Sequence, residues 1–260
     1  MRLALAAAAI AVGALTALVG CGGAGSKATA GPSSAVPVPS TAPATAAPVA
    51  VTTTSTPAQP PALGGAAPVP QPAIHQWPIP YGSPRKHEMA AYSLRHYGEN
   101  TAALSHPKVI VEHYTETGTA QEAFNTFASD EPDSEFHELP NTCAHFLVER
   151  SGRIDQLVPL SLRCRHTTGL NWTAIGIEHV GFSDQAILSD PAQIGASLRL
   201  TRWLRCRYAI AMKNVIGHNE SLTSPYHHDL VPAFQHQTHS DWNHADMARY
   251  RSLLARLPCR

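Results

Sequence analysis

The chain lacks an excess of charge of either sign, because its 19 Lys and Arg residues balance its 19 Asp and Glu residues. Nucleic-acid binding usually needs a basic surface, so the composition argues against a nucleic-acid partner. Closely paired cysteines, the mark of a structural zinc site, are also missing, and so is the His-Glu-x-x-His sequence of zincin peptidases. These absences argue against a zinc-finger-like domain and against a zincin.

The N-terminus predicts export. The first 19 residues contain one charged side chain, Arg2, followed by an apolar stretch that is short for a membrane span. That stretch ends in Leu18-Val19-Gly20-Cys21, which matches the lipobox of bacterial lipoproteins. We therefore predict a signal peptide over residues 1–20 and a lipid on Cys21, which would anchor the exported protein to a membrane, facing the cell wall. The alternative is an ordinary signal peptide with an incidental cysteine.

The next segment has little charge and much proline. Between residues 22 and 80, Lys27 is the only charged side chain, and 13 of the chain's 22 prolines lie there. Such a composition cannot bury enough apolar surface to offset the entropy of ordering. We predict that residues 21–80 comprise the lipidated Cys21 and a disordered linker, and that residues 81–260 form one domain, which holds 14 of the 15 histidines.

Four cysteines remain after Cys21, and an even number in an exported protein suggests two disulfides. Of the three possible pairings, we favour Cys143 with Cys164 and Cys206 with Cys259.

The periodicity of apolar residues in the domain predicts alternating strands and helices. The expected helices are 85–97, one beginning at the Thr119–Glu122 capping box, 191–208 and 246–254. The expected strands are 109–111, 144–148, 154–158, 173–181 and 214–217. This order predicts an α/β domain with a central mixed β-sheet flanked by helices.

Three apolar runs each end on a residue suited to metal binding or proton transfer, namely His113, Glu178 and His218. Alternation along the strand places Glu178 and His179 on opposite faces of the sheet. For each histidine, a hydrogen bond to backbone or a loop-capping role is the alternative to a ligand role. For Glu178 the alternative is a buried salt bridge, since an unpaired buried charge is costly.

Several stretches in order resemble the zinc-dependent N-acetylmuramoyl-L-alanine amidases of type 2, a family that includes the peptidoglycan recognition proteins. The matching stretches are residues 110–115, 144–154, 171–178 and 215–218. The resemblance implies that the domain is a zinc amidase, which cuts the amide between N-acetylmuramic acid and L-alanine in peptidoglycan or a muropeptide. We expect a monomer.

The resemblance also implies Zn²⁺ held by two histidines and an Asp or Cys. The histidines carry over onto His113 and His218. Asp241 in His239-Ser240-Asp241 is the preferred third ligand, and His228, Asp229 and His239 are the alternatives.

Other family roles carry over residue by residue. Glu178 matches the catalytic Glu of bacterial members, and Ala144 stands where some members have a Tyr. His239 takes the place of a Lys that many bacterial members have two residues before the ligand Asp, and would stabilise the oxyanion. His166 and Asn171 lie in the loop where members contact substrate.

Two competing functions remain open on the sequence. One is a muropeptide-binding module that lacks catalysis, and the other is a different zinc-dependent peptidase of the cell wall.

Overall fold

The computed structural model describes residues 68–259, so the predicted signal peptide, Cys21 and most of the predicted linker lie outside the described residues. Within the described part, no helix combines the length and the apolar character needed to cross a membrane.

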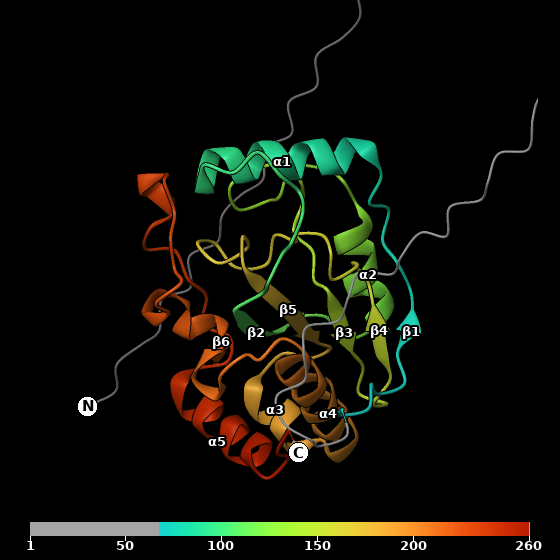
Figure 1. Ribbon diagram of the computed structural model, residues 1–260. Helices are drawn as coiled ribbons and strands as arrows, with labels where there is room; N and C mark the ends of the chain where they lie inside the picture. Colours follow the sequence, from blue (N-terminus) through green and yellow to red (C-terminus); the bar gives the residue numbers. More distant parts are fainter. Residues whose placement is uncertain (1–67, 260) are drawn as a thin grey trace, which may run out of the picture. The chain divides into compact units, whose positions relative to one another are not determined.

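Six strands form one mixed sheet in the order β1-β4-β3-β5-β2-β6 (Figure 1). Their bounds are β1 His75–Gln76, β2 Val109–Tyr114, β3 Phe146–Val148, β4 Ile154–Gln156, β5 Ala174–His179 and β6 Val215–Gly217. Strand β2 runs parallel to β5 and to β6, and β3 runs parallel to β5, whereas β3 and β4 form an antiparallel hairpin. The parallel strands β2, β5 and β6 therefore deliver their C-terminal ends to one edge of the sheet.

Within residues 68–259, five α-helices flank this sheet, with α3, α4 and α5 gathered on one side and α1 and α2 on the other (Figure 1). Their bounds are α1 Ser83–Tyr97, α2 Ala120–Ala128, α3 Asp184–Ser189, α4 Pro191–Arg207 and α5 His244–Ala255. Short 3₁₀ turns cover η1 Met212–Asn214, η2 His218–Thr223 and η3 Pro232–Phe234. The predicted fold class is confirmed.

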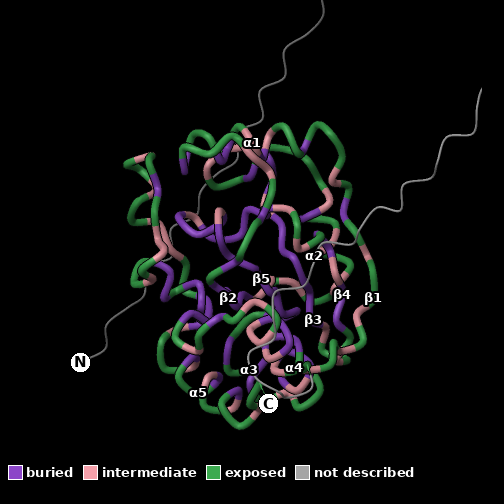
Figure 2. The backbone as a smooth tube through the Cα atoms, viewed as in Figure 1, coloured by how far each residue is buried: buried purple, intermediate pink, exposed green. Residues whose placement is uncertain are grey.

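Alternation along the strands divides the core between the two faces. Ile110, Ile175 and Ile177 pack in the same core as residues of α4 and α5, whereas Val109 and Val111 belong to a separate cluster. The inner strands β2 and β5 lie in the buried centre of the molecule (Figure 2). Residues of β2 on the same face of the sheet as Val109 and Val111 therefore point away from α4.

Most of the expected elements are present. The capping box at Thr119 is confirmed, since its side chain accepts from the backbone N–H of Glu122 while the Glu122 carboxylate accepts from the N–H of Thr119. Helix α3 was not predicted, because its six residues are too few to show a helical period.

Residues N-terminal to the expected boundary at residue 81 also pack on the domain. Strand β1 pairs with β4, the ring of Trp77 stacks on Phe124 with centroids 4.2 Å apart, and Ile79 is buried. The sequence did not predict this packing, because these residues lie among prolines in a segment whose composition suggests disorder.

Two disulfides link Cys143 to Cys164 and Cys206 to Cys259, as predicted. The second joins the end of α4 to the segment that follows α5.

Candidate metal centre

Three side chains from separate elements converge at the C-terminal edge of the parallel strands. His113 comes from the end of β2, His218 from the first position of η2 after β6, and Asp241 from the loop before α5. All three are buried, and one potential ligand atom from each lies within 4.8 Å of the others. No other such cluster occurs among residues 68–259.

Two of the separations in this cluster match the ligand spacing of a tetrahedral ion. Asp241 Oδ2 lies 3.2 Å from His113 Nδ1, and Asp241 Oδ1 lies 3.2 Å from His218 Nδ1. Ligand atoms about 2.0–2.2 Å from a tetrahedral Zn²⁺ are separated from each other by roughly 3.3 Å. The buried Nε2 of His218, on the other side of the ring from the Nδ1 that faces Asp241, has no hydrogen-bond partner within the described chain. Two imidazoles and one carboxylate are a donor set that suits Zn²⁺.

The loop carrying Asp241 is held against η2 by main-chain contacts. The backbone N–H of Asn219 donates to the Asp241 carbonyl at 2.9 Å. The Asp184 carboxylate accepts from the backbone N–H groups of Trp242 and Asn243 at 2.8 and 2.9 Å. These bonds fix the residue next to Asp241, so the approach of Asp241 to the histidines is built into the fold.

The orientation of His113 is set by groups on both sides of the sheet. Its Nε2 lies 3.2 Å from the hydroxyl of Thr167 and 3.2 Å from His166 Nδ1. Behind the strand, His179 Nδ1 donates to the His113 carbonyl at 2.7 Å, and His179 Nε2 lies 2.7 Å from the hydroxyl of Ser197 on α4. His179 therefore faces α4, as alternation predicted, and takes no part in the cluster. Such outer contacts fix the tautomer and ring plane of a ligand histidine.

The electrostatics favour the metal-binding charge states of Asp241 and His218, whereas the pKa of His113 is shifted toward the protonated imidazolium. Burial opposes ionisation of Asp241, but its hydrogen bonds with His113 and His218 outweigh that effect and hold its pKa well below the usual range. Burial lowers the pKa of His218 to about 4, so its imidazole is neutral near pH 7. Burial would also lower the pKa of His113, but Asp241 and Glu178 reverse that effect and raise it.

Glu178 lies beside this cluster on β5, in register with His113 of β2. Its side chain is nearly buried, and its Oε2 accepts no hydrogen bond within the described chain. Burial raises its pKa to about 7. Glu178 is in no ion pair among residues 68–259, so the alternative of a buried salt bridge does not describe it.

His166, Asn171 and His239 all line a small hollow next to the cluster, which His218 and Glu135 also line. His166 is buried, and burial holds its pKa well below the usual value. His239 is half exposed, stacks on the His218 ring with centroids 4.7 Å apart, and lies 3.1 Å from the Glu135 carboxylate.

Asn171 is engaged internally. Its Oδ1 accepts from the backbone N–H groups of His166 and Thr167 at 2.9 and 2.8 Å, and its Nδ2 donates to the Tyr92 hydroxyl at 3.3 Å. These contacts make Asn171 a support for the loop that carries His166.

The alternative third ligands lie elsewhere. The Asp229 carboxylate is buried against His96 of α1, with 2.9 Å between Oδ2 and Nδ1. His228 is exposed, and its backbone N–H donates to the Gly169 carbonyl. Neither residue belongs to the cluster. Sequence reasoning missed the supporting residues Asp184 and Ser197, since nothing in a single sequence shows which buried polar side chains meet across the fold.

Comparison with known proteins agrees with this geometry. A family model described as N-acetylmuramoyl-L-alanine amidase matches residues 103–239, so the chain belongs to the N-acetylmuramoyl-L-alanine amidase family. Its reaction is hydrolysis of the amide between N-acetylmuramic acid and L-alanine in peptidoglycan, which confirms the predicted bond and substrate class. The match ends two residues before Asp241.

Solved structures with some likeness include three amidases. The endolysin N-acetylmuramoyl-L-alanine amidase LysCS from Clostridium intestinale URNW is 20% identical over 55% of this chain and 79% of its own, with a TM-score of 0.39. The Escherichia coli amidase AmiD, solved with anhydro-N-acetylmuramic acid-L-Ala-D-gamma-Glu-L-Lys, is 29% identical over 46% of this chain and 51% of its own, with a TM-score of 0.36. AmpD is 19% identical over 68% and 93%, with a TM-score of 0.42. A comparison with curated protein sequences finds no match. The family assignment rests on the family model alone.

Proposed function

We propose that this amidase is zinc-dependent, with His113, His218 and Asp241 as the protein ligands. The observation that carries the proposal is the convergence of three buried ligand atoms within 4.8 Å of one another. Three protein ligands leave a fourth position for water or substrate, which is the pattern of catalytic rather than structural zinc. When bound, the ion supplies a Lewis acid that polarises the scissile carbonyl and lowers the pKa of water.

Glu178 is the proposed general base. It adjoins His113, carries an oxygen free of protein hydrogen bonds, and has a pKa that burial raises to about 7. A base with a pKa near the working pH can take a proton from the attacking water and then give it to the departing amine of L-alanine. The completeness of this set favours catalysis over a binding module.

His239 is the proposed oxyanion donor, and His166 and Asn171 are the proposed substrate-side residues. All three line the hollow beside the cluster. The exposed His239 ring, stacked on His218, can donate to an oxygen that gains charge at the adjoining carbonyl. Asn171 would act through the loop, and His166 through its contact with His113.

We further propose an exported, monomeric lipoprotein, with a signal peptide over residues 1–20, a lipid on Cys21 and a linker that lets the domain reach the wall. Support comes from the Leu18–Cys21 sequence, the Pro-rich composition and the cell-wall substrate of the family. Mass spectrometry of the membrane fraction tests the anchor, with Cys21→Ser as control. An unmodified Cys21, or equal membrane retention of Cys21→Ser, would contradict it.

The catalytic proposal is tested by digesting purified peptidoglycan with chelator-treated enzyme, before and after adding Zn²⁺. We expect stem peptides with a free L-Ala amine and stem-free glycans to appear after Zn²⁺ is restored. Wall that keeps its stems while the protein binds Zn²⁺ would support a binding module. Cleavage inside the stem would support a different peptidase, and full activity without metal would remove zinc from the mechanism.

A further inference from the structure

A second cavity lies at the opposite edge of the sheet from the metal centre. It measures about 410 Å³, and its wall includes His106 and Pro107, which directly precede β2. His113 stands near the other end of the same strand, about 15–20 Å away at the rise of an extended chain. The cavity is within the range of roughly 300–1,000 Å³ that is typical of small-molecule sites. It shares no residue with the hollow beside the metal centre.

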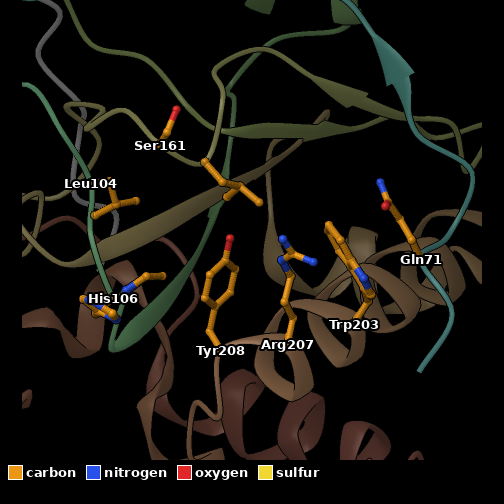
Figure 3. Close-up of a pocket in the computed structure, with 9 residues that line it drawn as sticks. Gln71, Leu104, His106, Ser161, Trp203, Arg207 and Tyr208 are labelled. Carbon is orange, nitrogen blue, oxygen red and sulfur yellow. The ribbon is translucent and has the colours of Figure 1, made fainter. Parts of the chain in front are cut away.

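The cavity is lined by one permanently charged cation, the exposed Arg207. The guanidinium carbon of Arg207, at the end of α4, lies 5.8 Å from the ring centroid of Trp203 and 5.5 Å from that of Tyr208. Figure 3 shows the three side chains next to one another, with Ser161 across the space from them. Contacts with two aromatic rings orient the exposed guanidinium and leave its hydrogen-bond donors unused.

The charge around this cation is unbalanced. No carboxylate lines the cavity, and Arg207 forms no ion pair within residues 68–259. Polar groups of Gln71, Ser161 and His106 stand among the apolar side chains of Leu104 and Leu160. A ligand that fits this lining has an apolar ring face, hydroxyl or amide groups, and one carboxylate that can accept hydrogen bonds from the Arg207 guanidinium.

The reaction of the family produces such a group. Hydrolysis of the lactyl amide adds water across the C–N bond, leaving a carboxylate on N-acetylmuramic acid and an amine on L-alanine. Uncut glycan carries an amide at that position and therefore no charge there. We propose that the cavity is a second, non-catalytic site that binds an N-acetylmuramic acid residue with a free lactyl carboxylate. It would hold the enzyme on glycan that it has already stripped, and the proposal rests on the family reaction.

The test is titration of the full chain with N-acetylmuramic acid and with its lactyl methyl ester. Binding is followed by calorimetry and by the indole N–H signal of Trp203, one of four Trp residues, assigned through Trp203→Phe. We expect the acid to bind at least tenfold more tightly than the ester. Arg207→Gln should lower the affinity for N-acetylmuramic acid at least tenfold. Arg199→Gln, the same change at an exposed position of α4, should leave that affinity unchanged.

Catalytic activity is measured in an assay separate from the binding titration. Arg207→Gln should keep its kcat/KM on a soluble muropeptide and lose retention on stem-free wall, so failure of the catalytic proposal would not be confused with failure of this one. Equal binding of acid and ester, unchanged binding by Arg207→Gln, or a sugar that binds only after deletion of residues 22–67 would each overturn the proposal. A loss of soluble-substrate activity in Arg207→Gln would also overturn it, because the cavity would then serve catalysis.

Discussion

Gly217 lies so close to Trp242 that a Cβ on the glycine would stand 1.9 Å from the Trp242 carbonyl oxygen. Because the obstacle is main chain, it cannot move away as a flexible side chain could. The two residues adjoin His218 and Asp241, so their contact sets the distance between two of the proposed ligands.

Gly217→Ala should therefore separate Asp241 from His218. We expect a loss of stability of about 3 kcal/mol from overpacking, together with weaker Zn²⁺ binding measured by competition with a chromophoric chelator. Gly195→Ala is the matched control, because its Cβ would meet only the flexible end of Arg199 at 3.4 Å. In a helix that change should be neutral or stabilise by about 0.5–1 kcal/mol. Unchanged metal affinity in Gly217→Ala would show that the contact does not set the site.

Glu178→Gln should lower kcat about 10²–10⁴-fold, the range for loss of a general base, while the metal content stays at one equivalent. Glu131→Gln, the same change at an exposed position in the loop after α2, is the control and should stay active. The wild-type rate should fall in acid, because a protonated carboxyl cannot accept the proton. The acid limb of the pH–rate profile should lie at or below about pH 7, because a bound cation lowers the pKa of Glu178 from its raised value. Undiminished turnover in Glu178→Gln would remove this residue from the mechanism.

Asp241→Ala should reduce Zn²⁺ affinity by more than about 100-fold, beyond the effect typical of an outer contact. His228→Ala should leave it unchanged, because His228 is exposed and lies outside the cluster. Metal content after gel filtration distinguishes the two. Retention of zinc by Asp241→Ala, with loss in His228→Ala, would reverse the assignment of the third ligand.

His239→Ala should lower kcat by about 10²-fold with little change in KM, as expected when a donor acts mainly in the transition state. Glu135→Gln breaks the same exposed pair from the other side and should have a small effect on kcat. Steady-state kinetics on a soluble muropeptide gives both constants. Equal losses in the two variants would mean that the pair, rather than the imidazole, matters.

His96 should make stability depend on pH. Burial opposes its protonation, but the carboxylates of Asp229 and Glu138 outweigh burial and raise its pKa. The stabilisation is therefore complete below the unfolded value of about 6.5 and disappears as pH rises through the raised folded value. His96→Gln should cost about 3 kcal/mol at pH 5–6 and less at pH 9, measured by urea unfolding. His87→Gln, on the exposed side of the same helix, is the control and should change stability by less than about 0.5 kcal/mol. A cost that does not vary with pH would contradict the ionic role of His96.

Local patterns were sufficient for most of the fold and for the positions of two proposed ligands. Apolar runs located β2, β5 and β6, and alternation correctly placed His179 on the face opposite Glu178, where it reaches Ser197. A strand end is a local property, so His113 and His218 could be found from short windows.

The third position depends on distant contacts. Asp229 and Asp241 both follow His218 within 23 residues, and nothing near either one distinguishes them. The fold separates them, because His96 of α1 binds Asp229 whereas the Asp184 carboxylate fixes the backbone beside Asp241. His239 was selected by its place in a family pattern, and its catalytic role stays a prediction. Strand β1 was missed because two residues among prolines carry no periodic signal.

Metal affinity depends on the register of the central strands, so it reports whether the sheet has paired correctly. β2 pairs with β5 and β6 at fixed residues, and a slip by one position would exchange His113 for Glu112 or Tyr114 and turn the imidazole toward α4. Partly folded chains with a shifted central strand would therefore present no complete ligand set. The proposed zinc ion would then bind the correctly paired sheet in preference to its competitors and stabilise it by mass action, so that a shortage of zinc would lower the amount of folded enzyme as well as of active enzyme.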